Sequence, residues 1–386
     1  MKHKIFFVIT LCIPFIFLEV VFRVLPVCYP PYILTTDEKN PVARFQENTN
    51  YLYSNGWNFN IISRKRTNNW GFANDQDYIR SDSSPLMVII GDSFVEAHQV
   101  ANEESMHGIL AKEAKPFGRV YSLGLSGAQL SQYLIFAEHA KDELSPNSMV
   151  FIIIGNDFDE SLIKYKSSPR LHYFEEKNDK YVLTLIDYNC SVLKKILRKS
   201  AFVRYLMLNL HIKENIKQLL MKFKHNPMQF VGNVPSVVSC QRLENSKKAV
   251  DEFFHQLPVK SGLGTKDILF VIDGLRPSLY SEEGLMDSKE SYCNQIRTYF
   301  IRRARQLGYE LVDMQPVFIE KNRHDGSTFE FPYDGHWNQL GHKLVASEIA
   351  KSQLYKSTFT PLNTLIKKDE DTRKIKSGSL QAQKTL

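Results

Sequence analysis

The chain has 386 residues, of which 43% are hydrophobic and 24% charged, and its formal net charge is +7. These values are typical of a globular protein and exclude a chain that is disordered over most of its length. The basic residues are spread along the sequence and form no arm in which they alternate with aromatic residues. The composition therefore predicts no nucleic-acid partner.

The first 25 residues predict a membrane anchor. A short basic segment, residues 1–4, precedes an apolar run over residues 5–25 that is long enough to cross a bilayer as a helix. Glu19 and Arg23 interrupt the run four residues apart, where they can pair on one helical face. Because no small-residue cleavage site follows, we expect an uncleaved single-pass anchor, with the rest of the chain outside the cytoplasm.

Residues 26–80 form a lead-in segment rich in Tyr, Asn, Pro and Trp, without a sustained period, and we expect irregular structure or short strands there. Beyond it, short apolar runs alternate with helical patterns over residues 81–364. This alternation predicts an α/β fold with a doubly wound, flavodoxin-like and mostly parallel sheet. The expected strands are 85–90, 119–123, 148–154, 267–272 and 309–313, and the clearest helices are 103–114 and 128–144.

The alternation is interrupted over about 159–264, which predicts a helical insertion on the same domain. Within it, the basic stretch 194–225 has helical periodicity and a single acidic residue, Glu214. Its charge favours a solvated helix face, with anionic lipid or an acidic polysaccharide as the alternatives. The polar tail over 365–386 is predicted to be disordered.

Cysteine spacing gives no metal or redox motif. Cys190, Cys240 and Cys293 are scattered through the body of the chain without any C-x-x-C. Outside the cytoplasm, a disulfide between two of the three is permitted, and the sequence does not select a pair. We expect no metal and no organic cofactor.

A candidate nucleophile follows the first expected strand. Gly91-Asp92-Ser93-Phe94 places Ser93 in a turn at the start of a helix, where free backbone N–H groups can bind a developing oxyanion. A serine of this kind needs an oriented base. His336 precedes an amphipathic run near the end of the chain, and Asp334 is close enough in sequence to accept the ring N–H.

Two further strand ends supply candidate oxyanion donors. Gly124, after the second strand, can present its backbone N–H closely because it has no side chain. Asn156, after the third strand, has an amide that can donate to the same oxyanion. Because the carboxyl ends of parallel strands share one edge of a sheet, these groups are predicted to meet there.

The set of Ser93, Gly124, Asn156 and His336 resembles the four blocks of the SGNH/GDSL hydrolase superfamily. The resemblance implies a nucleophile at Ser93, a triad completed by His336 and Asp334, and an oxyanion hole formed by Ser93, Gly124 and Asn156. It is closest to bacterial members with one N-terminal transmembrane helix, which include polysaccharide acetylesterases and acetyltransferases. Such members also carry an Asn-x-x-Gly-Phe stretch, as in residues 68–72 here.

The last block departs from the family pattern. Its aspartate commonly lies three residues before the histidine, whereas Asp334 lies two before His336. The segment 336–342 parallels the family's His-Pro-Asn-x-x-Gly-His, which selects His336 as the base and makes His342 a helix-face residue. The Asp-x-His spacing occurs in the polysaccharide O-acetyltransferase branch, so this departure favours acetyl transfer over ester hydrolysis without removing the triad.

Three rival hypotheses remain. Ser126 lies in an incomplete G-x-S-x-G elbow. Ser161 with Lys164 fits S-x-x-K, and Lys260-Ser261-Gly262 resembles the K-T-G box of penicillin-binding proteins, but no S-x-N element lies between them. A non-catalytic glycan-binding or assembly protein could also use this fold, but it would not require nucleophile, base and oxyanion donors together. We therefore expect a serine esterase that acts on an acylated carbohydrate, with O-acetyl transfer as the alternative.

Overall fold

The computed structural model describes residues 2–178, 180–213, 215–216 and 230–359, with residues 2–12 as backbone only. Its centre is a five-stranded sheet in the order β11-β10-β5-β3-β4, and all neighbouring strands are parallel. Counted along the chain, this order is the doubly wound, flavodoxin-like arrangement. The α/β fold with a parallel sheet is thus confirmed. The strands are β3 (Leu86–Gly91), β4 (Arg119–Gly124), β5 (Ser148–Ile153), β10 (Ile268–Ile272) and β11 (Glu310–Asp313).

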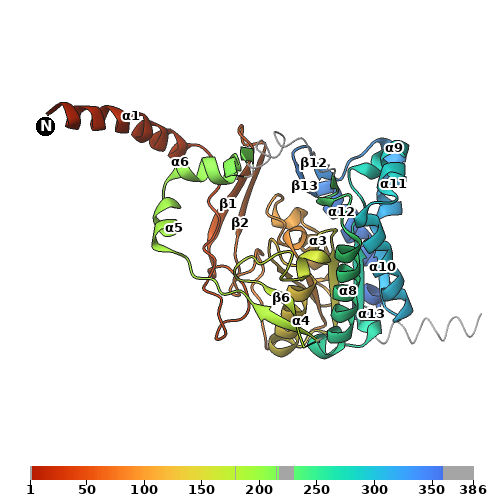
Figure 1. Ribbon diagram of the computed structural model, residues 1–386. Coiled ribbons are helices and arrows are strands. Elements are labelled where there is room, and N and C mark those ends of the chain that lie inside the picture. Colours follow the sequence, from red (N-terminus) through yellow and green to blue (C-terminus); the bar gives the residue numbers. More distant parts are fainter. Residues whose placement is uncertain (1, 179, 214, 217–229, 360–386) are drawn as a thin grey trace, which may run out of the picture.

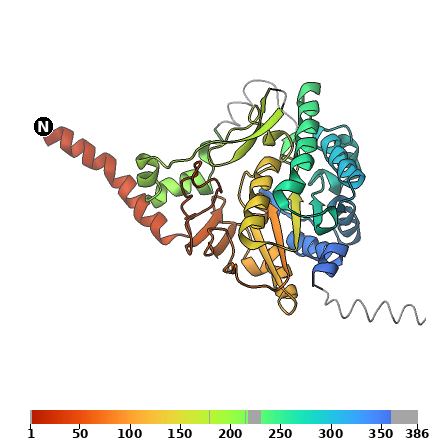
Figure 2. The ribbon, with the colours of Figure 1, turned by 90° about the horizontal axis from the view of Figure 1, so that it is seen from below.

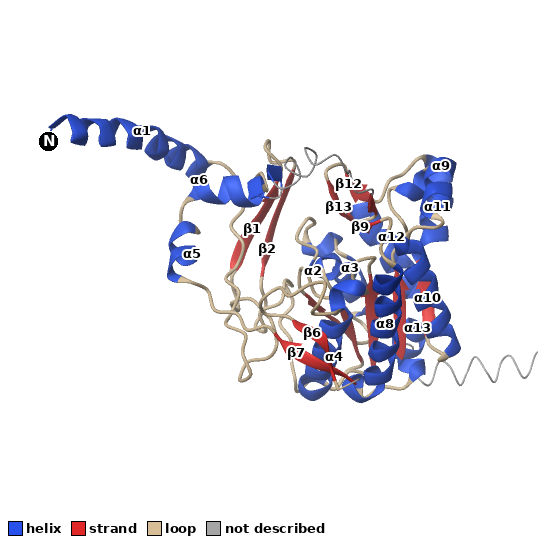
Figure 3. Ribbon diagram, in the orientation of Figure 1, coloured by secondary structure: helices blue, strands red, loops and turns tan. Residues whose placement is uncertain are grey.

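Both faces of the sheet are covered by helices (Figure 3), so alternate residues of each strand face two different cores. In β3, Val88 and Ile90 face one core, and Met87 and Ile89 face the other. The first core lies beneath α4 (Leu130–Leu144), α8 (Cys240–Ser261) and α10 (Tyr292–Gln306). The second lies beneath α2 (Ser93–Glu96), α3 (Met106–Ala114), α11 (Met314–Asp325), α12 (Gln339–Lys351) and α13 (Gln353–Phe359). A further helix, α9 (Glu282–Ser288), follows β10.

The segment predicted as a helical insertion contains strands as well as helices. It begins with the antiparallel pair β6 (His172–Lys177) and β7 (Lys180–Leu185) and also holds the pair β8 (Phe230–Val231) and β9 (Val234–Pro235). Its described helices are α5 (Val192–Leu197), α6 (Ala201–Arg204) and the crossover helix α8. Part of the basic stretch 194–225, with Glu214, and the tail 365–386 lie outside the described residues.

The lead-in segment forms a β-hairpin. Strands β1 (Asn50–Asn55) and β2 (Ile61–Arg66) pair antiparallel, and the hairpin lies between α6 and the sheet domain (Figure 1). The last hairpin of the chain, β12 (Glu330–Phe331) and β13 (Asp334–Trp337), precedes α12. Both hairpins contribute to the site described below.

The predicted transmembrane anchor is not supported. Helix α1 (Lys2–Val24) projects from the rest of the chain (Figures 1 and 2), but no helix among the described residues is long and apolar enough to span a membrane. Glu19 and Arg23 pair at 2.8 Å, as expected. The Glu19 carboxylate also accepts hydrogen bonds from the Ser200 hydroxyl and from two backbone N–H groups at the start of α6. The C-terminal end of α1 is therefore held at the start of α6 by the Glu19 carboxylate.

No disulfide joins the body cysteines. Cys190, Cys240 and Cys293 are all free thiols in the described part of the chain. Cys293 is buried beside Gly155, and burial raises the pKa of its thiol to about 12. A disulfide between two of these residues was permitted by the sequence, and the structure contains none among them.

Candidate active site

Ser93 lies at the junction of β3 and α2, where the chain turns sharply. A Cβ atom at Gly91 would lie 2.5 Å from Val95, so glycine is needed for the helix to fold back over the strand. Asp92 caps α2 by accepting the Phe94 N–H at 2.9 Å. Burial raises the pKa of Asp92 to about 6. Ser93 thus begins a capped helix at the point where the strand order reverses, which is where doubly wound sheets bind ligands.

His336 meets Ser93 from the other end of the chain. The Ser93 hydroxyl lies 2.7 Å from His336 Nε2, and His336 Nδ1 is hydrogen-bonded to Asp334 Oδ1. Asp334 Oδ1 also accepts the His336 backbone N–H at 3.0 Å. With Nδ1 protonated toward the carboxylate, Nε2 is free to accept the serine proton. The structure therefore brings the three predicted triad residues together in the order that proton abstraction requires.

The pKa shifts of His336 and Asp334 suit a histidine that acts as a general base. Burial tends to lower the pKa of His336, but the hydrogen bond and charge of Asp334, with a smaller effect of Asp92, raise it above its ordinary value. For Asp334, burial acts to raise the pKa, and hydrogen bonds from His336 and Gln99 hold it well below its ordinary range. Asp334 is therefore ionised whenever His336 titrates.

Asn156 is held with its amide at the pocket. Its Nδ2 donates to Glu160 at 2.9 Å, and its Oδ1 accepts a hydrogen bond from Asn233. Both asparagines line the same cavity as Ser93 and His336. The second N–H of the Asn156 amide has no acceptor among the described residues and is available to an oxyanion.

Gly124 does not line the pocket, contrary to the prediction. It is the last residue of β4, and a Cβ atom there would lie 2.5 Å from the Glu96 backbone nitrogen in α2. The glycine allows this close packing of helix and strand. Gly127, three residues later, lines the pocket instead and has a φ of +83°. Its backbone N–H has no acceptor among the described residues, so Gly127 replaces Gly124 as the candidate oxyanion donor.

The pocket has a volume of about 320 Å³, and its lining includes Arg276, which the sequence did not indicate. Arg276 is buried and binds Asp273 through two nitrogens, at 3.1 and 2.7 Å. It also donates to Glu330 at 3.1 Å and to the Gly335 carbonyl at 3.2 Å. Because Gly335 lies between Asp334 and His336, this network fixes the loop that carries the base. The i, i+3 spacing of Asp273 and Arg276 after a predicted strand was the available signal.

The residues around the last block are structural. Trp337 is fully buried, and its indole N–H donates to Asp273 Oδ1 at 3.1 Å. Asn338 caps α12 by accepting the Gly341 N–H at 2.9 Å. His342 is buried and accepts the Met106 N–H at 3.3 Å, and burial lowers its pKa to about 3. His342 is therefore a neutral packing residue and no rival base.

The two rival serines are hydrogen-bonded to acceptors other than a histidine or lysine. The Ser126 hydroxyl donates to the buried carboxylate of Glu96, and the Ser161 hydroxyl donates to the backbone oxygen of Asp157. Lys164 lies over the ring of Tyr165. None of these serines is hydrogen-bonded to a histidine or lysine among the described residues.

The Asn-x-x-Gly-Phe stretch is a buried turn. Asn68 Oδ1 accepts the backbone N–H groups of Trp70 and Phe72, both at 3.0 Å. Gly71 has a φ of +76°, and a Cβ atom there would lie 2.2 Å from the Phe45 carbonyl oxygen. These contacts assign the stretch a structural role in the lead-in segment.

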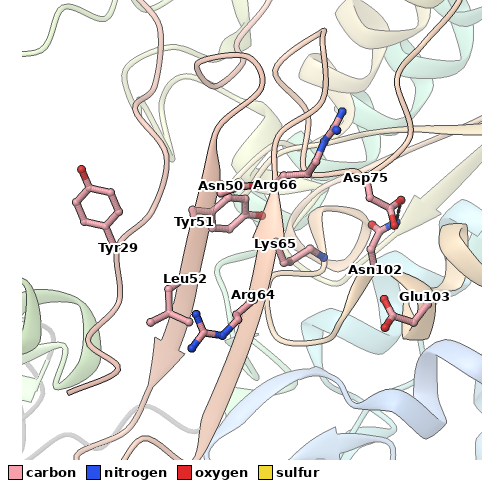
Figure 4. Close-up of a pocket in the computed structure, with 10 residues that line it drawn as sticks. All are labelled: Tyr29, Asn50, Tyr51, Leu52, Arg64, Lys65, Arg66, Asp75, Asn102 and Glu103. Carbon is pink, nitrogen blue, oxygen red and sulfur yellow. Dashed lines mark hydrogen bonds between the residues drawn. The ribbon is translucent and has the colours of Figure 1, made fainter. Parts of the chain in front are cut away.

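A second hollow, of about 570 Å³, lies against the β1–β2 hairpin (Figure 4). Basic side chains of β2, including Arg64 and Lys65, line it together with the acidic residues Asp75 and Glu103. The Lys65 ammonium is already bound to the Ala97 carbonyl at 2.6 Å. This hollow contains neither the serine nor the histidine of the triad.

No protein-family model and no curated protein match the chain. Several solved structures do. LAE5, an alpha/beta hydrolase from the metagenome of Lake Arreo, is 14% identical, with 69% of this chain and 94% of that one covered and a TM-score of 0.37. A lipolytic G-D-S-L protein from Veillonella parvula is 10% identical, with 70% of this chain and 98% of that one covered and a TM-score of 0.35. The acetyl xylan esterase AlAXEase is 12% identical, with 68% of this chain and 97% of that one covered and a TM-score of 0.35. At these values the similarities carry no argument about activity, which rests on the geometry of the site.

Proposed function

We propose that the chain is a serine esterase in which Ser93 is the nucleophile and His336 the general base. The observation that carries the proposal is the 2.7 Å contact between the Ser93 hydroxyl and His336 Nε2, with Asp334 on the opposite ring nitrogen. A serine, an imidazole and a carboxylate in this order activate a hydroxyl for attack on a carbonyl.

The reaction begins when Ser93 Oγ attacks the ester carbonyl carbon and its proton passes to His336 Nε2. The oxyanion that forms accepts hydrogen bonds from the backbone N–H groups of Ser93 and Gly127 and from Asn156 Nδ2. As the tetrahedral intermediate collapses, His336 gives the proton to the leaving alcohol. The acyl group remains on Ser93, and water completes hydrolysis by the same sequence in reverse.

We propose an O-acetylated glycan as the substrate and keep O-acetyl transfer as the second candidate. The spacing of Asp334 and His336 favours transfer, because the sequence resembles the acetyltransferase branch at this block. In transfer, a sugar hydroxyl replaces water as the acceptor of the acyl group. A non-catalytic glycan binder is disfavoured because it needs no serine bonded to a histidine.

The test is turnover of an aryl acetate by the full-length protein, with and without an acetylatable glycan. We expect Ser93→Ala to lose at least about 10³-fold in kcat and Ser126→Ala to lose far less than Ser93→Ala. Equal rates in wild type and Ser93→Ala would refute the proposal, and selective loss in Ser126→Ala would favour the elbow hypothesis. Labelled acetyl recovered on the glycan, and absent as free acetate, would select transfer over hydrolysis.

We also propose that the catalytic domain lies outside the cytoplasm. The proposal rests on the basic residues that precede the apolar N-terminal run. A reporter enzyme that works only outside the cytoplasm, fused after residue 60, should be active. Activity of a fused reporter that works only inside the cytoplasm would refute this location.

A further inference from the structure

One face of strand β1 points at the catalytic residues. Side chains two residues apart share a face of a strand, and Tyr51, Tyr53 and Asn55 form such a set in β1. Ser54, on the opposite face, contacts Asn209 of the insertion instead. The face of Tyr51, Tyr53 and Asn55 is called the inner face of β1 below.

The inner face binds the triad carboxylate. Asp334 Oδ2, the oxygen that does not contact the His336 ring, accepts the Tyr53 hydroxyl and the Asn55 amide, each at 3.3 Å. The Gln99 amide lies 3.4 Å from the same oxygen. Three donors on one oxygen leave Asp334 no freedom to rotate away from His336.

The same face reaches the loop that carries Gly127. The Tyr51 hydroxyl is bonded to His98 Nδ1 at 2.8 Å, and the Tyr53 ring stacks on His98 at 5.7 Å. His98 Nε2 lies 3.2 Å from the buried carboxylate of Glu96.

Glu96 in turn holds the residue before Gly127. Its carboxylate accepts the Ser126 backbone N–H at 2.9 Å and also the Ser126 hydroxyl. Burial acts to raise the pKa of Glu96, but the nearby His98 and the hydrogen bond from Ser126 outweigh it and keep this pKa below its ordinary value. Arg170 donates to the Ser126 carbonyl at 3.0 Å, so the peptide units before and after Ser126 are both held by a side chain.

We propose that the inner face of β1 is a positioning element of the active site, which holds the triad carboxylate through Tyr53 and Asn55 and the oxyanion loop through Tyr51, His98 and Glu96. This inference rests on the proposed function, since it assigns roles relative to Ser93 and His336. It makes the lead-in hairpin part of the catalytic unit.

Single hydroxyl deletions test the two branches separately. Tyr53→Phe should lower kcat about tenfold with KM within about twofold, because it removes a hydrogen bond to a charged group. Tyr51→Phe should lower kcat about threefold. Tyr299→Phe is the matched control, because it removes a 2.7 Å hydrogen bond from a tyrosine of α10 to the Asp251 carboxylate of α8. The control should keep both constants within about twofold of wild type.

The titration of His336 distinguishes positioning from a general structural defect. His336 faces Asp334, Ser93, Asp92 and Arg276. Loss of the Tyr53 donor concentrates negative charge on the Asp334 oxygen nearest the ring, so the His336 pKa should rise by about half a pH unit. Tyr51→Phe and Tyr299→Phe should leave it unchanged.

Nitrogen NMR of the full chain labelled at histidine measures this shift without any substrate, with the His336 signal assigned by its loss in His336→Gln. If Tyr53→Phe fails to fold, Asn55→Ala removes another donor to the same oxygen and should shift the titration in the same direction. Titration curves and kcat values in Tyr53→Phe that match those of Tyr299→Phe would overturn the inference. Equal turnover by wild type and Ser93→Ala would instead refute the proposed function, while the NMR shift would still decide the positioning role.

Discussion

The buried aspartate beside the nucleophile should cost stability at neutral pH. Burial is the main cause that raises the pKa of Asp92 from 3.8 to about 6. The difference is about 2 pH units, or about 3 kcal/mol at about 1.36 kcal/mol per unit. Because the folded-state pKa is the higher one, the folded state holds the proton longer. The free energy of unfolding therefore falls as the pH rises from about 4 to about 6 and stays lower above that range.

Asp92→Asn should remove this cost and keep the cap. Asparagine can accept the Phe94 N–H as aspartate does, so the variant should match wild type at pH 4 and exceed it by about 3 kcal/mol at pH 8. Urea unfolding of both proteins between pH 4 and pH 8 measures the difference. The loss of the Asp92 charge should also move the acid limb of the rate profile to lower pH, because that charge raises the pKa of His336.

The exposed carboxylate Asp37 provides a control for this experiment, since its pKa is lowered by hydrogen bonds with Asn40 and Lys39 and not raised by burial. Asp37→Asn should gain no stability with rising pH. A difference between wild type and Asp92→Asn that is the same at every pH, or a wild type more stable than the variant at pH 8, would refute the reasoning.

Three further outcomes are expected. Asn156→Ala should lower kcat on an aryl acetate about 100-fold with little change in KM, because one oxyanion donor is lost; an unchanged kcat would remove Asn156 from the oxyanion hole. The rate should fall at low pH with a midpoint above 6.5, since the pKa of His336 is raised, and Asp334→Asn should lower kcat by about 10⁴-fold; a midpoint below 6.5 in wild type would contradict the role of Asp334. In thermal melts, Gly124→Ala should be less stable than Gly127→Ala, because a Cβ atom at Gly124 would lie 2.5 Å from backbone, a clash that should cost more than the strain of a side chain at the positive φ of Gly127; the reverse order would contradict the packing role of Gly124.

The sheet was predictable because its strands are buried on both faces. Wholly apolar runs such as Leu86–Gly91 and Ser148–Ile153 have no competing polar pattern, so their positions agree with the sequence prediction within a residue or two. The meeting of Ser93 and His336 followed from the same logic, since both precede helices near one edge of the sheet.

The sequence prediction placed the oxyanion donor after β4 at Gly124, whereas Gly127 is the glycine of this segment that lines the pocket. Gly124 ends its strand and was chosen for that reason, but a strand-ending glycine can also serve the packing of strand against helix. Gly127, with its positive φ just before the next helix, carries the signal of a turn that exposes its N–H. Sequence alone does not separate these two uses of glycine.

For the lead-in segment the sequence predicted irregular structure or short strands, and neither the pairing of β1 with β2 nor their role was predicted. Tyr51, Tyr53 and Asn55 alternate with the period of a strand, which was the available signal. Asp334, the partner of Tyr53 and Asn55, lies more than 270 residues away in sequence, and no local pattern encodes a contact at that separation. The same limit applies to the pocket residue Arg276, whose partner Glu330 lies 54 residues away in sequence.

Covalent capture of the nucleophile tests the central assignment most directly. Wild-type protein treated with an alkyl fluorophosphonate should gain one adduct mass, and peptide mapping by mass spectrometry should place it on Ser93, with slower labelling in His336→Gln. An unlabelled protein, or an adduct on Ser126 with Ser93 unmodified, would contradict the account.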